Sequence, residues 1–526
     1  MYKASKRPSW FIWLPLAGAS LLVVGLLVGV TLEQSAAPAV EITEVDEVSS
    51  NAFGIGSIEE ILRYIEAKYV DNVNREAIVD GTINNLLAEL DPHSSYISPS
   101  KLAAHREQLN GTKTGIGVDV LMLRDSVTVA KALPLGPAEE AGVKPYDRII
   151  SIADTLVSGV GRSLTDVEAF LKSLPEGAIQ LEIYRPGKGA LMPITVSPRE
   201  MTLPSVSEGF LLEDEVAYVH IKQFANETYQ QFMQQVERLV KDSAAKPLII
   251  DLRGNTGGYL QEAVNVLSQL FPDEGRLLVY TEGDHSPRKD YKTTGRVFFS
   301  VENVAVIIDE GTASASEILA GAIQDWDRGI VVGQRSFGKG LVQELYPLKN
   351  GGALHITVAR YFTPSGRSIQ RDYKDLGAYR AGYDSLSQLS PKQYVTASGR
   401  SVYSGGGISP DVEVRLNRHI DEVNFSEARE AFDLFRFEYL EHLNTDQDPS
   451  EIALAFRRYL AQKEFELNDD QWAYYRSEIE EELRLAVVKK NLGLPAAERS
   501  RIERDPFVVE AVKAVKGAQL IARQND

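Results

Sequence analysis

Two serines separated by one alanine lie where a buried strand gives way to a helix, and one of them could act as a nucleophile. They belong to "GTASASEILAGAIQD", residues Gly311 to Asp325, and the preceding "NVAVIIDE" has the apolar, β-branched character of a buried strand. Ser314 with Glu317 is also the pattern of a capping box, which needs no catalysis. A serine hydroxyl is a weak nucleophile, so its chemistry depends on a neighbouring base.

Lys339 is the candidate base. It lies between two glycines in "GQRSFGKGLVQ", after the predicted strand "GIVVG", and a tight turn there would present its ammonium group inward. Burial must lower the pKa of this lysine from near 10.4 to about 7–8 before it can accept a proton. Gln343, four residues further on, could hydrogen-bond the lysine nitrogen. The helix start behind Ser314 also exposes N–H groups, which suit a developing oxyanion.

Other residues compete for these roles. Ser316 is a second serine, but it lies about 200° around the helix axis from Ser314, so both cannot face one lysine. A Ser–His–Asp hydrolase would need a positioned histidine, for which His220 and His355 are the candidates. Both are on predicted strands, and neither adjoins the G-x-S-x-G turn typical of such enzymes, so we disfavour that class.

Composition excludes several classes of function. The chain has 526 residues, enough for three or four domains, and a net charge of -18 without a dense basic run after residue 32, so we expect no nucleic-acid partner. Cysteine is absent, which excludes disulfides and thiolate metal sites. The seven histidines are scattered without metal-ligand spacing, and we expect neither a metal nor a cofactor.

The N-terminus predicts a membrane anchor. Residues 9–32 carry no charge and are long enough to span a bilayer. Basic residues lie in the tail 1–8 and acidic residues in the linker 33–56, so the positive-inside rule places the rest of the chain outside the cytoplasm. A cleaved signal peptide is the alternative, since small residues surround Ala37, but the apolar segment is longer than such peptides usually have.

Helices are predicted at both ends of the remaining chain. Residues 57–102 contain two short helices with apolar faces, which cannot form a core alone and would pack on another surface such as a second copy. Residues 415–526 are nearly all helical in pattern, and their charges are typical of solvated helix faces. The apolar residues of the first region are Ile58, Ile61, Leu62, Ile65, Tyr69, Ile78, Ile83, Leu86, Leu87 and Leu90.

Residues 103–198 resemble a PDZ domain. Predicted strands surround one helix, "TGIGVDV" stands where that family has its carboxylate-binding loop, and "GPAEEAGVKPYDRIISI" is the more specific part of the match. Such a loop would bind a chain-terminal carboxylate through backbone N–H groups around Gly115 and Gly117, with Ile116 and Val118 lining the side-chain pocket. The alternative for the two glycines is an ordinary β-turn.

Residues 199–414 alternate buried strands with helices, which predicts a layered α/β core. Within it, "DLRGNTGG" follows the strand "PLII" and places a glycine-rich loop at a strand's carboxyl end, where open α/β sheets bind ligands. The expected architecture is therefore a multidomain α/β protein: a transmembrane helix, an N-terminal helical region, a PDZ domain, an α/β core and a C-terminal helical region.

Five motifs in order carry a resemblance to a known family. "LDPHSSYISP", "DLRGNTGG", "GTASASEILAGAIQD", "VVGQRSFGKGLVQ" and "GGGISPDV", within residues 57–414, resemble the carboxyl-terminal processing peptidases, or tail-specific proteases. The resemblance implies a crotonase-like α/β core and a Ser–Lys endopeptidase whose PDZ domain captures substrate C-termini. Thr256 stands where the family often has proline, which removes no backbone donor.

The resemblance also implies roles for individual residues. Ser314 is the nucleophile, Lys339 the general base, and Gln343 the residue that orients the lysine. The oxyanion hole consists of the Ala315 N–H and one N–H from Gly257 or Gly258.

The expected protein is a single-pass endopeptidase of a bacterial inner membrane, with its catalytic part in the periplasm, that cuts proteins near their C-termini. We expect protein substrates bound by their tails, and a homodimer. The alternative function is a non-catalytic membrane-anchored PDZ adaptor, which would bind C-termini without needing the serine, lysine and glutamine together.

Overall fold

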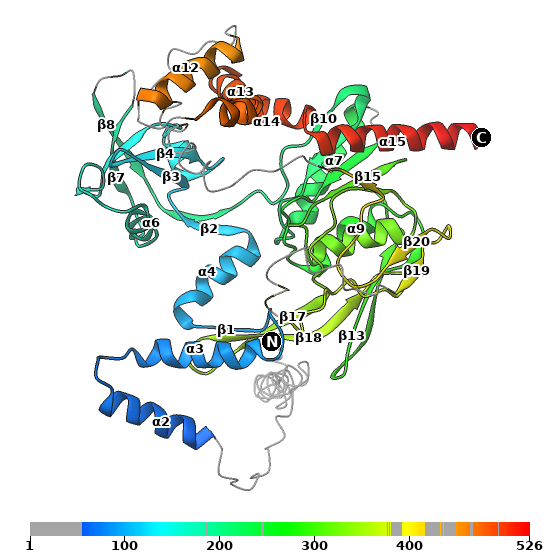
Figure 1. Ribbon diagram of the computed structural model, residues 1–526, viewed down its shortest axis with the longest axis horizontal. Coiled ribbons are helices and arrows are strands. Elements are labelled where there is room, and N and C mark those ends of the chain that lie inside the picture. The colour runs from blue at the N-terminus through cyan, green and yellow to red at the C-terminus, as the bar shows by residue number, and fades with distance from the viewer. Residues whose placement is uncertain are drawn as a thin grey trace, which may run out of the picture. The chain divides into compact units, whose positions relative to one another are not determined.

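The fold is described from a computed structural model (Figure 1). It describes residues 55–185, 188, 190–243, 247–375, 377, 379, 392–415, 432, 435, 448–462, 467–492 and 494–525. The predicted tail 1–8, the anchor 9–32 and the linker as far as residue 54 lie outside these residues. Among the described residues, no helix is long and apolar enough to cross a membrane.

The chain divides into two compact units, Met1–Val79 and Asp80–Asp526. The first contains α2 (Ile55–Lys68), and α3 (Arg75–Ala88) begins in it. Both helices agree with the sequence prediction. Of the predicted apolar face of α2, Ile58 and Ile61 are 48% and 58% exposed, whereas Leu62 is buried.

In the second unit, a sheet ordered β3-β4-β5-β7-β8 forms the domain predicted to be a PDZ domain. Its core is made of alternating apolar side chains, and Val127, Val129, Ile149 and Leu181 are fully buried. β3 lies at the edge of the sheet. The elements are β3 (Val118–Leu123), β4 (Ser126–Ala132), α5 (Pro137–Glu140), β5 (Arg148–Ile152), β6 (Thr155–Leu156, paired with β5), α6 (Leu164–Lys172), β7 (Ile179–Tyr184) and β8 (Leu191–Val196).

A mainly parallel sheet forms the centre of the predicted α/β core, in the order β10-β11-β12-β15-β16-β21. Its strands are β10 (Phe210–Leu211), β11 (Ala217–His220), β12 (Leu248–Asp251), β15 (Val304–Ile308), β16 (Ile330–Gly333) and β21 (Val412–Glu413), and only β10 pairs antiparallel. Every residue of β15 is buried. Continuous apolar strands of this kind are expected where helices cover both faces of a parallel sheet.

The two faces of this sheet have different covers. Val306 and Ile308 point to a core shared with α7 (Thr228–Ser243), α8 (Leu260–Ser268) and α9 (Ala315–Asp325). Ala305 and Ile307 point the other way, against Phe507, Val508, Ala511 and Val515 of α15 (Pro506–Asn525). The helix α15 therefore covers the second face of the sheet, although it lies beyond the predicted core boundary at residue 414.

Further elements surround the two sheets. A second sheet of the core joins β1 (Ser95–Ile97), β18 (Ala353–Phe362), β13 (Glu274–Gly283) and β14 (Ser286–Thr294), with β17 (Leu341–Pro347) on β18. The remaining elements are α4 (Pro99–Asn110), β2 (Thr112–Gly115) paired with β9 (Arg199–Thr202), η2 (Glu213–Glu215), and β19 (Gln393–Val395) paired with β20 (Ser401–Tyr403). In the C-terminal region α12 (Pro449–Gln462), α13 (Asp469–Leu492) and α14 (Leu494–Glu503) are helical, as predicted.

Candidate active site

Ser314 occupies a strained turn between the central strand β15 and helix α9. Its φ is 57° and its ψ is -117°, a conformation that residues with a side chain rarely adopt and that is common at functional sites. The Ser314 side chain makes no capping hydrogen bond. Only the other half of the predicted capping box forms, because the Ser314 N–H donates to the Glu317 carboxylate at 2.8 Å. The serine hydroxyl is thus not engaged as a cap.

Ser316, the competing serine, is fully buried, and its hydroxyl donates to the Asn255 carbonyl at 3.0 Å. That contact ties α9 to residues 252–258, which we call the glycine loop. A second bond, from the Ala313 N–H to the same carbonyl at 2.9 Å, reinforces it. Ser316 therefore has a structural role and does not face the lysine.

Glu317 links the backbones on either side of the site. One carboxylate oxygen accepts from the N–H groups of Ser314 and Lys339, both at 2.8 Å. The other accepts from the Gly338 N–H at 2.8 Å and the Ser336 hydroxyl at 2.5 Å. Glu317 is fully buried, and burial raises its pKa to about 7 against the opposing effect of these donors.

Tyr361, on β18, contacts the same two backbones through their carbonyls. Its hydroxyl lies 3.0 Å from the Ser314 carbonyl oxygen and also hydrogen-bonds the Lys339 carbonyl. Burial raises the pKa of Tyr361 well above its ordinary value, so it remains a donor. Glu317 and Tyr361, which we call the clamp, thereby hold the N–H and C=O groups of Ser314 and Lys339 together.

Lys339 is half-buried, and burial lowers its pKa, while the charges of Asp91 and Glu317 act in the opposite direction. Gln343 does not make the predicted bond to this lysine. Its amide nitrogen donates to the Thr357 hydroxyl at 3.2 Å, and no hydrogen bond joins it to Lys339 in the described part of the chain.

Asp91 is a neighbour of the lysine that sequence reasoning did not single out, although it lies in the motif "LDPHSSYISP". Its carboxylate accepts from the Ser94 hydroxyl at 2.6 Å, and Ser94 in turn accepts from the Thr357 N–H at 3.1 Å. His93 lies beside it, 2.8 Å from the Tyr379 hydroxyl, and burial lowers the pKa of His93 to about 4. This histidine is therefore neutral at physiological pH.

The glycine loop packs directly against Ser314. A Cβ atom on Gly257 would lie 2.7 Å from the Ser314 Cβ and 3.0 Å from the Ala315 nitrogen, so a side chain there is excluded. The Gly257 N–H already donates to Asn255 Oδ1 at 2.9 Å. By contrast, the N–H groups of Gly258 and Ala315 have no hydrogen-bond partner among the residues that the structure describes.

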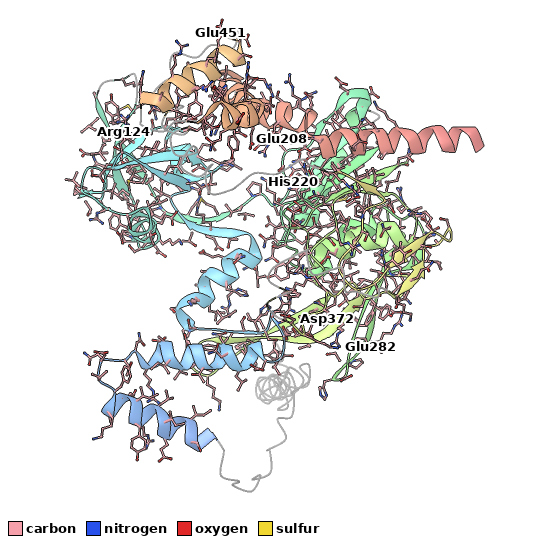
Figure 2. All side chains as sticks on the ribbon, viewed as in Figure 1. Arg124, Glu208, His220, Glu282, Asp372 and Glu451 are labelled. Atoms are coloured by element: carbon pink, nitrogen blue, oxygen red, sulfur yellow. The ribbon has the colours of Figure 1, made fainter. Side chains whose placement is uncertain are left out.

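The two histidines of the alternative hydrolase have other partners. His220, labelled in Figure 2, lies at the end of β11 with its Nε2 3.3 Å from the Arg253 carbonyl oxygen. His355, on β18, packs edge-on against His105 at 5.5 Å, and burial lowers the pKa of His355 to about 4. Neither histidine hydrogen-bonds Ser314 in the described chain.

In the predicted PDZ domain, Gly115 and Gly117 have φ values of 145° and 78° and make a tight turn into the edge strand β3. The positive φ of Gly117 favours glycine there, and a Cβ at this position would also lie 2.9 Å from the Met201 sulfur and 3.3 Å from the Gly136 Cα. Ile116 and Val118, predicted to line the pocket, are 2% and 7% exposed and belong to the core of this domain.

Comparison with known proteins identifies both domains. Residues 215–375 match the model of peptidase family S41, and residues 114–196 match that of the PDZ domain. The chain is 32% identical over 318 residues to carboxy-terminal processing protease CtpB of Bacillus subtilis, covering 60% of this chain and 65% of that protein. It is 32% identical over 317 residues to a carboxy-terminal-processing protease of Bartonella bacilliformis, covering 59% and 71%.

A solved structure described as photosystem II D1 C-terminal processing protease is 29% identical, covers 68% of this chain and 86% of its own, and gives a TM-score of 0.36. The curated matches extend over about two thirds of each relative's length. The sequence relationship, with the serine peptidase and PDZ matches in the expected order, shows that this chain belongs to the carboxy-terminal processing proteases, serine peptidases of family S41.

Proposed function

We propose that this protein is a membrane-anchored endopeptidase that cuts proteins near their C-termini by a Ser–Lys dyad, on an α/β core of the crotonase-like type. The clamp is the observation that carries the dyad. Glu317 and Tyr361 bond the backbones of Ser314 and Lys339 from two sides, and burial lowers the pKa of the lysine. Acyl transfer requires a serine and a base with a lowered pKa, and here the backbones of the two candidate residues are held together.

The reaction then proceeds in two halves. Neutral Lys339 takes the proton of the Ser314 hydroxyl as its oxygen attacks the scissile carbonyl carbon. The Ala315 N–H and the Gly258 N–H, neither of which has a partner among the described residues, stabilise the oxyanion. Lys339 returns the proton to the leaving amine, which leaves an acyl-serine. In the second half Lys339 deprotonates a water molecule, which attacks the ester, and the serine recovers its proton.

The Gly258 N–H is preferred to that of Gly257 for the oxyanion because Asn255 already occupies the latter. In this proposal the hydrogen bond from Gln343 to Thr357 stabilises the segment that follows Lys339. A rotation of the Gln343 side chain would bring its amide oxygen to the lysine.

The test is cleavage of casein and of a tailed protein substrate by the full chain in detergent. Ser314→Ala should lower kcat by roughly 10⁴–10⁶-fold while still binding a C-terminal peptide. Unchanged cleavage by a folded Ser314→Ala protein contradicts the dyad. If the wild type binds peptides but cuts nothing, the PDZ adaptor is the better function.

Substrate capture is assigned to the PDZ domain. Gly115 and Gly117 turn the backbone into the edge strand β3, and an edge strand can accept a peptide as an added strand. A substrate's terminal carboxylate would bind the N–H groups of residues 115–118, and tail binding can favour the competent site only by a difference in affinity for its two states. Free protein tails are therefore the proposed recognition element.

Two parts of the proposal concern the surroundings of the enzyme. Residues 9–32 would anchor it in a bacterial inner membrane with the protease in the periplasm, which a protease-accessibility assay on intact and permeabilised spheroplasts would test.

The exposed apolar residues of α2 support a homodimer, because uncovered apolar patches often mark interfaces. Light scattering of the detergent-solubilised chain should give twice the monomer mass, and a concentration-independent monomer contradicts the dimer.

A further inference from the structure

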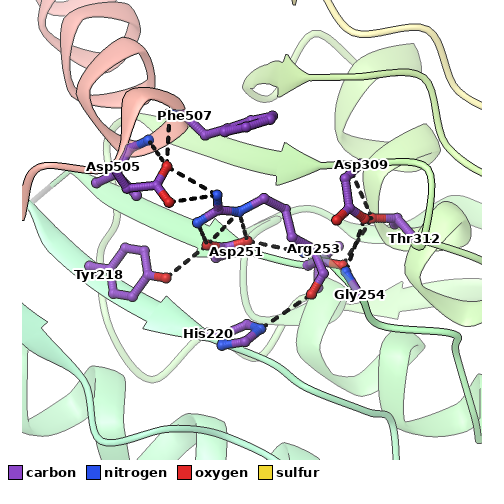
Figure 3. Close-up of polar contacts among 11 residues, drawn as sticks. Tyr218, His220, Asp251, Arg253, Gly254, Asp309, Thr312, Asp505 and Phe507 are labelled. Atoms are coloured by element: carbon purple, nitrogen blue, oxygen red, sulfur yellow. Dashed lines mark hydrogen bonds and ion pairs between the residues drawn. The ribbon is translucent and has the colours of Figure 1, made fainter. Parts of the chain in front are cut away.

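Arg253, the third residue of "DLRGNTGG", connects the end of strand β12 to the C-terminal helix α15 (Figure 3). Its guanidinium bonds the Asp251 carboxylate through Nε at 3.0 Å and Nη2 at 2.6 Å. Its Nη1 bonds both oxygens of Asp505, at 2.8 and 3.0 Å. The guanidinium also lies 4.8 Å from the ring centre of Phe507, in the first turn of α15.

Asp251 and Asp505 are not equivalent partners. The side chain of Asp251 is 2% exposed, and the Tyr218 hydroxyl donates to it at 2.8 Å. Asp505 has a side chain that is 20% exposed, and it also accepts from the Phe507 N–H at 2.9 Å, as a helix cap does. Loss of Asp505 therefore leaves no buried charge unpaired, because Asp251 still neutralises Arg253.

The same segment begins the glycine loop, and its backbone is held in place. The Arg253 N–H donates to Asp251 at 3.0 Å, and the Arg253 carbonyl contacts His220. The Gly254 N–H donates to Asp309 at 2.9 Å, and the Thr312 hydroxyl donates to the Leu252 carbonyl at 2.9 Å. Among the described residues of the glycine loop, Arg253 is the one whose side chain bonds the start of α15, through Asp505.

Helix α15 is itself fixed to the sheet. Phe507, Val508, Ala511 and Val515 are buried against Ile249, Ala305 and Ile307 on the face opposite α9. Residues 505–515 lie outside the part of the chain that matches the peptidase family, residues 215–375. The arginine thus links the glycine loop to a helix on the other side of the sheet from Ser314.

We infer that Asp505 and Arg253 are positioning residues for peptide hydrolysis, through which α15 keeps the glycine loop aligned with Ser314. The inference rests on the proposed function, in which a loop N–H stabilises the oxyanion. Such a donor acts only when it is preorganised, and displacement of about 1 Å costs on the order of 10²-fold in rate. The pair acts on the transition state, so its loss lowers kcat and leaves KM unchanged.

The experiment measures kcat and KM of the full chain with a tailed substrate. Asp505→Asn keeps the helix cap and the side-chain shape but removes the charge that fixes the guanidinium, and we expect kcat to fall about tenfold at constant KM. Asp505→Glu restores the charge and should recover most of this loss. Thermal unfolding of each variant shows whether the fold is retained.

Asp448 provides a matched control. It also precedes a helix of the C-terminal region, α12, and accepts from the Ser450 N–H at 3.0 Å, but no arginine bonds it in the described chain. Asp448→Asn should leave kcat within twofold of wild type. An unchanged kcat for Asp505→Asn, an equal loss for Asp448→Asn, or a loss confined to KM overturns the inference.

The outcome is separable from that of the proposed function. If Ser314→Ala is inactive and Asp505→Asn is fully active, the dyad stands and the positioning role falls. If Ser314→Ala retains activity, the proposed function falls first, and an oxyanion role for the glycine loop falls with it.

Discussion

The turn at Ser314 and the turn at Gly115 to Gly117 occupy opposite kinds of position in their sheets. The turn at Ser314 follows β15, which has a strand on both sides, whereas the turn at Gly115 to Gly117 leads into β3, an edge strand. Around Ser314, buried side chains hold the backbone from several directions. The PDZ turn leads instead to a strand whose outer side pairs with no other strand of the described residues. In the proposed function, chemistry therefore takes place where the backbone is most constrained, and recognition takes place where the backbone can still accept a partner.

Lys339→Arg tests the proposed active site at Ser314 and should cause the largest loss of kcat. Arginine cannot lose its proton at accessible pH, so kcat should fall by about 10²–10⁴-fold. In the wild type, activity should rise with pH as Lys339 loses its proton, with a midpoint below that of free lysine because burial lowers its pKa. Exposed Lys349, replaced by arginine, is the control. Substantial turnover by folded Lys339→Arg protein would exclude the lysine as base.

Glu317→Gln should produce the next largest effect. A glutamine offers one acceptor oxygen, and its NH₂ group would face two of the N–H or O–H donors that the carboxylate now satisfies. The Ser314 and Lys339 backbones should separate, with kcat reduced by about 10–100-fold and KM little changed. Exposed Glu310→Gln removes the same charge nearby and should be neutral. Equal activities of the two variants would show that the clamp is not needed.

Amidation of a substrate's C-terminus tests the proposed carboxylate-binding turn of the PDZ domain. If the N–H groups around Gly115 and Gly117 bind the carboxylate, amidation should reduce kcat/KM by about tenfold, the loss of one or two charge-assisted hydrogen bonds. A short apolar peptide with a free carboxylate should then stimulate cleavage of a substrate that lacks a tail. If that peptide only competes with the substrate, the PDZ domain holds the substrate but does not control the activity of the site. Equal cleavage of amidated and free tails would show that Gly115 and Gly117 do not bind the carboxylate and form an ordinary turn.

Gln343→Ala should have the smallest effect, because the amide bonds Thr357 and not the lysine. We expect kcat to fall by about threefold, the cost of one side-chain hydrogen bond near the site. Gln180, exposed on β7, gives the control substitution to alanine. A loss as large as that of Lys339→Arg would show that the glutamine contacts the lysine during turnover.

The residues proposed for the site could be singled out from the sequence because the patterns that mark them are local. A serine at a strand–helix turn, a lysine between glycines and a glycine loop after a strand can each be recognised within a few positions. The α/β core and the terminal helices were predicted from the periodicity of their apolar residues, and the PDZ domain from its resemblance to that family. The membrane anchor and the dimer stay predictions.

The contacts that hold the site could not be predicted in this way. Glu317 was assigned to a capping box from its neighbour Ser314, but its other donors are 19 to 22 positions away. Tyr361 lies beside Phe362 at the end of β18, and no local pattern shows that its hydroxyl reaches Ser314. The expected hydrogen bond between Gln343 and Lys339 is not formed in this structure. The spacing of the two residues allows it, but Gln343 bonds the more distant Thr357.

The cover provided by α15 has a consequence for the order of folding. The ion pair between Arg253 and Asp505 joins residues 252 positions apart, and closing so large a loop is slow compared with forming local helices. The Ser314 turn and most of its sheet are synthesised long before this helix emerges from the ribosome. If α15 aligns the glycine loop as inferred, a nascent chain contains the nucleophile before its surroundings are complete, and it reaches full activity only when α15 docks.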